Sequence, residues 1–160
     1  MECNICQILK NPSLVLFKTP YWLVSLAPDQ GYLGRAYATL LDHKAALHEL
    51  SAEEWTDFAN LTRKIETSWK QAFGADPFNW ACMMNNAYQD DPAHPHVHWH
   101  IRPRYTQSVE LNGQTFTDKS YGHHYDRDQR NFVDDKTLRL IVAKLRSALE
   151  SSPADVPSNK

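Results

Sequence analysis

The sequence predicts an α+β fold, in which an antiparallel sheet of about five strands and two main helices form a single domain. Segments that alternate between apolar and polar residues occur in runs, whereas two segments with helical spacing stand apart from them. The 160 residues are enough for one core, and no repeat or linker divides them. The last two main strands flank a short loop, so antiparallel pairing is the simplest arrangement. We expect one domain over residues 1–150, followed by a flexible tail over residues 151–160.

Alternating side chains predict the strands, because successive residues of an extended chain point to opposite faces of a sheet. Turn-forming residues separate these segments, with Thr19-Pro20 after the first and the run from Pro28 to Gly31 before the third. The dipeptide Asn112-Gly113 is typical of hairpin turns and predicts a further small hairpin. The main strands are expected at residues 14–18, 21–26, 35–41 and 79–85 and in the histidine-rich segment that begins at His94.

Two helices are predicted from their caps and their apolar spacing. Residues 51–54 form a capping box, in which the Ser51 hydroxyl accepts from a free helix amide and Glu54 bonds back. Apolar side chains then recur at helical spacing until Gly74, which marks the end of the helix. The second helix begins at Asp134-Asp135, since negative charge is favoured at a helix N-terminus. Its apolar face consists of Leu138, Ile141, Leu145 and Leu149.

Composition excludes several classes of partner. The chain carries 17 basic and 19 acidic residues and a net charge of -2, so no overall positive field attracts a nucleic-acid polymer or a membrane. No apolar run approaches the ~20 residues of a membrane span, and residues 1–4 lack the features of a signal peptide, so a cytoplasmic location is expected. The three cysteines, Cys3, Cys6 and Cys82, cannot all pair within one chain, which disfavours a disulfide framework.

Four of the eight histidines alternate along one short segment, the most informative feature of the chain. In a strand their rings would share one face, while Val97, Trp99 and Ile101 would anchor the other face to the core. Imidazole has an unperturbed pKa of about 6.5 and can act as a base, a nucleophile or a metal ligand. From these residues alone, nucleophilic catalysis and metal binding are almost equally open. A purely structural role is disfavoured, because each buried ring would need a hydrogen-bond partner. The four residues are His94, His96, His98 and His100.

The segment His96–Arg104 resembles the signature of the histidine-triad (HIT) family, with three alternating histidines, hydrophobic residues between them and a Pro-Arg pair shortly after. Residues 3–6, Cys-Asn-Ile-Cys, are similar to the Cys-x-x-Cys opening common among bacterial members. The turn that carries His43 and the helix cap after it also match the family order, and Asn85 falls where members carry a nucleotide-contacting asparagine. The resemblance covers about residues 3–105. It implies a HIT-like sheet, usually in a homodimer whose two sheets join.

The resemblance further implies that His98, the middle histidine of the triad, is a nucleophile. It would attack the α-phosphate of a nucleotide and form a covalent nucleotidyl-histidine that water then hydrolyses. His96 and His100 would complete the catalytic group, with His100 beside the phosphate. The implied function is that of a nucleotide hydrolase or nucleotidyl transferase, acting on a dinucleoside polyphosphate or a nucleoside phosphoramidate. The residues expected around the substrate are Asn85, His43 and Gln89.

A structural zinc ion is also implied by the resemblance, whereas an organic cofactor is not. The spacing of Cys3 and Cys6 is alone a weak signal that also fits redox chemistry or two ordinary thiols. In zinc-binding members of the family, the positions of His43 and His96 serve as ligands, and tetrahedral zinc needs four. The expected metal ligands are therefore Cys3, Cys6, His43 and His96, with His94 as a less favoured substitute for His96.

Several positions depart from the family pattern. Arg35 stands where members usually carry histidine, and Ala27 where an acidic residue often holds the ribose hydroxyls, with Asp29 as the nearest substitute. Asp91-Pro92 replaces a Gly-Gln pair that commonly contacts phosphate, which leaves Gln89 as the nearest glutamine. These departures favour a second interpretation, a nucleotide-binding or scaffold module with little turnover. A third is a metal-dependent hydrolase that uses the histidine ladder as ligands.

The polar stretch over residues 106–131 lies outside the resemblance. It is expected to contact a partner subunit or the rim of the pocket. Of the two arginines after the triad, Arg102 is expected to add positive charge near the site and Arg104 to be structural.

Overall fold

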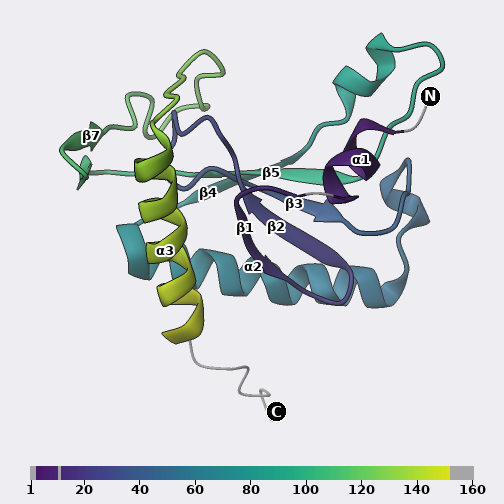
Figure 1. The fold of residues 1–160 in the computed structure, drawn as a ribbon, viewed down its shortest axis with the longest axis horizontal. Helices are drawn as coiled ribbons and strands as arrows, with labels where there is room; N and C mark the ends of the chain where they lie inside the picture. The colour runs from purple at the N-terminus through teal and green to yellow at the C-terminus, as the bar shows by residue number, and fades with distance from the viewer. Residues whose placement is uncertain (1–2, 11, 152–160) are drawn as a thin grey trace.

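The structure, a computed structural model, describes residues 3–10 and 12–151. At its centre is an antiparallel sheet of five strands in the order β1-β2-β3-β5-β4 (Figure 1). The predicted fold class is confirmed, whereas the predicted tail falls outside the described residues from position 152 onwards. The strands are β1 (Val15–Lys18), β2 (Trp22–Leu26), β3 (Ala36–Leu40), β4 (Phe78–Cys82) and β5 (His98–Pro103).

Helix α2 (Ala52–Phe73) runs along one face of this sheet (Figure 1). The predicted capping box is present: the Ser51 hydroxyl accepts from the N–H of Glu54, and the Glu54 carboxylate accepts from the N–H of Ser51. The helix ends at Gly74, whose φ of 75° is the left-handed conformation that favours glycine. Trp69 on the inner side of the helix is fully buried, so the amphipathic pattern faces the core as predicted.

Helix α3 (Asp135–Ser151) packs against α2 and β1 (Figure 1). At its start the Asp134 carboxylate accepts from the N–H of Thr137 at 2.7 Å. The predicted hairpin is also present and consists of β6 (Val109–Leu111) and β7 (Gln114–Phe116). No helix within the described ranges is both long enough and apolar enough to cross a membrane.

Three short elements differ from the sequence prediction. Helix α1 (Asn4–Lys10) was not expected, because its seven residues bury no side chain and show no clear amphipathic pattern. Strand β4 ends at Cys82, and the chain continues as a 3-10 helix, η2 (Asn85–Gln89), so Asn85 opens a turn instead of ending a strand. A second 3-10 helix, η1 (Leu47–Glu49), precedes α2.

Strand β5 begins at His98, four residues later than predicted. Thr39 of β3 pairs with His98, and β3 ends at the next residue, Leu40. Because the partner strand stops there, His94 and His96 lie in the loop before β5. The histidine segment is therefore half strand and half loop.

Candidate active site and metal site

All four histidines of the ladder line one cavity of about 550 Å³, two from β5 and two from the loop before it. The intervening apolar side chains lie on the other side of the segment. Val97 and Ile101 are fully buried, and Trp99 packs against Phe58 of α2 with ring centroids 4.9 Å apart. The core thus fixes the strand whose opposite face carries the histidines.

A hydrogen bond to its neighbour fixes the orientation of the His98 ring and, in the neutral form, its tautomer. Its Nδ1 lies 2.8 Å from the backbone oxygen of His96. A carbonyl oxygen can only accept a hydrogen bond, so Nδ1 carries the proton. In the neutral ring the other nitrogen, Nε2, then holds the lone pair that a nucleophile needs. The ring of His100 lies beside it, with centroids 5.0 Å apart.

His100 is a neutral ring at physiological pH. Burial lowers the pKa of His100 to about 3, and the positive charges of His98, Arg102 and Arg35 add to the effect. The ring packs edge-on against Tyr37 of β3, with centroids 5.1 Å apart. Its Nδ1 is buried and has no hydrogen-bond partner in the part of the chain that the structure describes. The ring also hydrogen-bonds to the backbone of Met83, so in the neutral form Nδ1 is an acceptor.

The depressed pKa of His100 predicts a loss of stability in acid. The unfolded chain takes up this proton near pH 6.5, whereas the folded ring accepts it only near pH 3. Between these values the unfolded state binds more protons, so stability falls as the pH drops, by at most about 1.4 kcal/mol per pH unit from this group. Urea unfolding at pH 7 and pH 5 should show a larger loss for wild type than for His100→Gln. Equal losses in the two proteins would contradict the assignment.

Two cysteines and two histidines from distant parts of the chain meet beside the cavity. Cys3 precedes α1 and Cys6 lies within it, whereas His43 follows β3 and His96 precedes β5. Their ligand atoms all lie within 4.8 Å of one another. The structure thus brings together the four residues expected as metal ligands.

The separations within this cluster fit tetrahedral zinc. Zn–S bonds of about 2.3 Å and Zn–N bonds of about 2.0–2.1 Å place a sulfur and a nitrogen ligand roughly 3.5 Å apart. His96 donates its Nε2–H to the backbone oxygen of Leu40 at 2.8 Å, which leaves Nδ1 for a metal. Burial lowers the pKa of His96 and favours the neutral form that ligation requires. The Sγ–Nδ1 distances are 3.6 Å for Cys3 and His96, 3.4 Å for Cys6 and His96, and 3.3 Å for Cys6 and His43.

The three residues predicted to contact the substrate do not all line the cavity. Asn85, at the start of η2, lines the cavity and is exposed. Gln89 lies at the far end of η2 and His43 in the metal cluster, and neither is among the described residues that line the cavity. His94 lines the cavity and is not part of the metal cluster. Substrate contact by Asn85, Gln89 and His43 stays a prediction.

Asp29, the nearest substitute for the missing ribose acid, makes its contacts inside the protein. Its carboxylate is buried, forms an ion pair with Arg35, and accepts from the N–H groups of Gly31 at 3.0 Å and Asn131 at 2.9 Å. These contacts tie the turn before β3 to the segment before α3. Both carboxylate oxygens are thus engaged inside the protein, which disfavours Asp29 as the substitute for the ribose acid.

Four arginines line the cavity, and only one of them was expected near the site. Arg102 follows His100 by two residues on β5 and is one of the two arginines that follow the triad in the sequence. Of the other three, Arg35 directly precedes β3, and Arg127 and Arg130 lie in the loop before α3. The four are Arg35, Arg102, Arg127 and Arg130.

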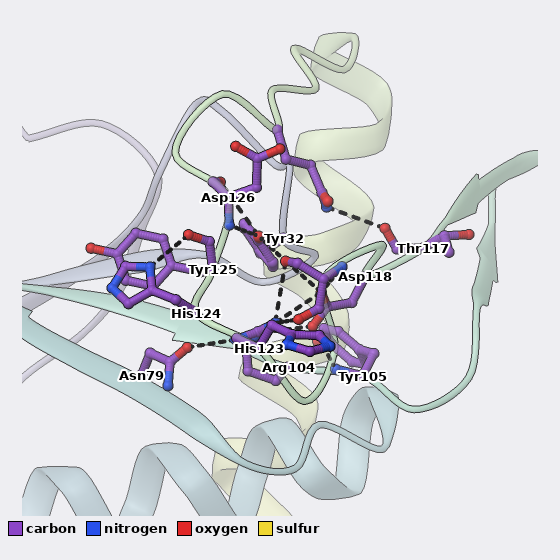
Figure 2. A network of polar contacts seen from close by, with 12 residues as sticks. Tyr32, Asn79, Arg104, Tyr105, Thr117, Asp118, His123, His124, Tyr125 and Asp126 are labelled. Carbon is purple, nitrogen blue, oxygen red and sulfur yellow. Dashed lines mark hydrogen bonds and ion pairs between the residues drawn. The ribbon is translucent and has the colours of Figure 1, made fainter.

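Arg104 points into a buried polar network outside the cavity (Figure 2). Its guanidinium forms an ion pair with Asp118, with Nε–Oδ2 at 2.6 Å and a second contact at 3.1 Å. The network folds part of the stretch 106–131 against the end of β5, and later residues of the same stretch line the cavity. Of the two placements expected for this stretch, the pocket rim is the one observed. The remaining acceptors of Arg104 are the Asn79 side chain, the Ser120 hydroxyl and the backbone oxygens of Ser120 and His123.

No protein-family profile matches the chain. The adenosine 5'-monophosphoramidase hnt1 of Schizosaccharomyces pombe is 32% identical over 113 residues, which span 69% of this chain and 80% of that protein. Among solved structures, a hypothetical histidine triad nucleotide-binding protein from Sulfolobus tokodaii has a TM-score of 0.69 at 15% identity and covers 92% of both chains. A zinc-bound histidine triad family protein from Mycobacterium smegmatis has a TM-score of 0.62 at 20% identity and covers 94% of both chains.

A uridylyltransferase is similar as well, with a TM-score of 0.66 at 18% identity over 96% of this chain and 46% of that one. At these identities the structural similarities show a shared fold. The sequence relationship to the yeast protein is closer and spans most of both chains. The chain therefore belongs to the histidine-triad family.

Proposed function

We propose that the protein is a nucleotide hydrolase or nucleotidyl transferase that acts at an α-phosphate through a covalent intermediate on His98. The observation that carries this proposal is the hydrogen bond from Nδ1 of His98 to the backbone oxygen of His96. It leaves a lone pair on Nε2 of a ring that lines the cavity. The names of two similar proteins, a phosphoramidase and a uridylyltransferase, support this class of reaction.

The reaction would proceed in two displacements. In the first, the Nε2 lone pair of His98 attacks the α-phosphorus, and the bond to the leaving group breaks with its electron pair on that group. In the second, water attacks the same phosphorus, the P–N bond breaks, and the water proton passes to solvent. A different acceptor in place of water makes the enzyme a transferase. Neutral His100 lies beside His98, with ring centroids 5.0 Å apart, and lines the cavity that would hold the phosphate.

Trapping the intermediate tests this function. The protein is mixed with adenosine phosphoramidate or a diadenosine oligophosphate and quenched in alkali, which preserves P–N bonds. Intact-mass measurement should show one added nucleotidyl group, and peptide mapping should place it on His98. Binding without an adduct or turnover would instead support a nucleotide-binding module. Turnover without an adduct, lost on chelation and restored by metal, would support a metal-dependent hydrolase.

We also propose that Cys3, Cys6, His43 and His96 hold one structural zinc ion. The ion would link α1 to the turn after β3 and to the loop before β5. Zinc at 1,000 times its dissociation constant adds about 4 kcal/mol to the stability of a folded state that alone binds it. Thiolate ligands also need a reducing compartment, in agreement with the predicted cytoplasmic location.

Cys6→Ser is expected to lose the zinc and to lower the unfolding midpoint, since one of four ligands is removed. Elemental analysis and thermal unfolding measure both effects. Cys82→Ser is the matched control, because Cys82 lies on β4 outside the cluster and burial raises the pKa of its thiol. Equal zinc content in wild type and Cys6→Ser would refute the proposed site.

A homodimer is proposed from the family resemblance. Strand β4 is an edge of the five-stranded sheet, so a second copy could pair with it and extend the sheet. Light scattering should give twice the mass of one chain, and a single-chain mass at working concentration would reject the dimer.

A further inference from the structure

Arg102 is a buried cation whose charge is not matched by an acid of the described chain. Its side chain is 6% exposed, and no ion pair of Arg102 occurs within residues 3–10 and 12–151. One terminal nitrogen, NH1, is buried without a hydrogen-bond partner there. The guanidinium lies over the ring of Tyr125, with Cζ 4.1 Å from the centroid. A buried donor without a partner costs free energy, so this arrangement is suited to an anion that enters the cavity.

A second arginine lies next to it. Ala36 pairs with Ile101 across β3 and β5, so the residues that continue this register are Arg35 and Arg102. Both line the cavity, and the Nε of Arg35 is also buried without a partner among the described residues. The Arg35 charge contributes to lowering the pKa of Arg102, after the larger effect of burial. Like charges at opposed strand positions repel each other unless an anion lies between them.

We propose that Arg35 and Arg102 form a subsite for the phosphate chain beyond the α-phosphate, with Arg127 and Arg130 at its rim, so that the substrate is a nucleoside or dinucleoside oligophosphate. This inference rests on the proposed function, because it names the substrate class of the same site.

The order of groups along β5 supports this assignment. His98, His100 and Arg102 succeed one another at every second residue, and all three line the cavity. With the α-phosphorus at His98, the next phosphoryl groups lie past His100 towards Arg102. With the phosphate chain placed in this direction, Arg102 would lie beside the phosphoryl group that departs. The arginines would then stabilise the negative charge that builds up on the departing phosphate.

The two candidate substrate classes, nucleoside phosphoramidates and oligophosphates, differ in their negative charge. A phosphoramidate of a nucleoside presents a single ionised phosphoryl group, which His98 and His100 can accommodate. Each further phosphoryl group adds negative charge, and the cavity offers four arginines against one acidic lining residue, Asp90. The Asp29 carboxylate is a second acid near these arginines: it pairs with Arg35, and its Oδ2 lies 3.6 Å from NH1 of Arg130. Two acids are therefore set against four cations. The excess positive charge matches an oligophosphate.

Kinetics of Arg102→Met on two substrates test the subsite. The ratio of kcat/KM for diadenosine tetraphosphate to that for adenosine phosphoramidate should fall about 10- to 100-fold relative to wild type, since charge-assisted hydrogen bonds to the chain are lost. The unfolding midpoint should stay the same or rise, because a buried unpaired charge is removed. Arg63→Met, at an exposed position of α2, is the matched control and should leave the ratio unchanged. An unchanged ratio in Arg102→Met would overturn the subsite.

Binding of inorganic tripolyphosphate separates the subsite from the proposed chemistry. Calorimetry should show at least 10-fold weaker binding to Arg102→Met than to wild type, whether or not either protein turns over a nucleotide. If Arg102→Met binds tripolyphosphate more weakly but wild type turns over no nucleotide, the subsite is supported and the proposed function is rejected. Equal binding by the two proteins would reject the subsite and leave the function of His98 untouched.

Discussion

Replacing His98 by asparagine should lower nucleotide turnover by about 10³-fold or more, because the nitrogen proposed as the nucleophile is lost and the proposed covalent intermediate cannot form. On the opposite side of the ring, the substitution preserves the hydrogen bond that Nδ1 donates. The asparagine amide can still donate to the backbone oxygen of His96, the contact that Nδ1 makes at 2.8 Å in the native protein. The fold and the cavity should therefore persist, and substrate should still bind. Turnover of a nucleotide panel, with binding measured in parallel, checks this.

His48→Asn is the matched control for this experiment. His48 lies on η1, is exposed, and does not line the cavity as far as the described residues show. Its replacement should leave kcat unchanged. If His98→Asn and wild type were equally active on the preferred nucleotide, His98 could not be the nucleophile.

Arg104→Met should lower the free energy of unfolding by about 3–5 kcal/mol, the range seen when one partner of a buried ion pair is removed. The substitution leaves the Asp118 carboxylate, whose side chain is fully buried, without its counter-charge. It also leaves the Asn79 side chain and two backbone oxygens without their donor (Figure 2). Urea unfolding measures the loss through the shift of the midpoint.

Two further variants distinguish this effect from a general cost of losing charge. Adding Asp118→Asn to Arg104→Met should recover part of the stability, because the orphaned charge disappears. Lys70→Met removes an exposed ion pair to Asp76, with side chains 65% and 63% exposed, and should cost less than about 1 kcal/mol. An Arg104→Met protein that unfolds at the wild-type urea concentration would show that the network contributes no net stability.

The main strands and the long helix could be predicted because each depends on local chemistry. The capping box at Ser51 and the glycine at position 74 define α2 by hydrogen bonds and backbone conformation within a few residues. The alternation around Trp99 likewise identifies the buried side of β5. His98 could be singled out for the same reason, since its register against the following Pro-Arg pair is a property of one segment.

The elements that the sequence could not predict depend on distant partners. The first residue of β5 depends on where its partner strand β3 ends. The residues around His94 carry no sequence signal for that end. The rim arginines, Arg127 and Arg130, reach the cavity because the Arg104 network folds the stretch before them. That network joins positions 14 and more residues apart, and such pairings leave no period in the sequence.

His96 contacts the cysteine thiols with its side chain and the ring of His98 with its backbone. Its ring reaches the thiols of Cys3 and Cys6, while its backbone oxygen holds the ring of His98. A movement of α1 that displaces the two thiols would therefore be transmitted through His96 to His98, the proposed nucleophile. A His96 variant therefore disturbs both sites at once. The orientation of the proposed nucleophile thus depends on how firmly the two cysteines are held.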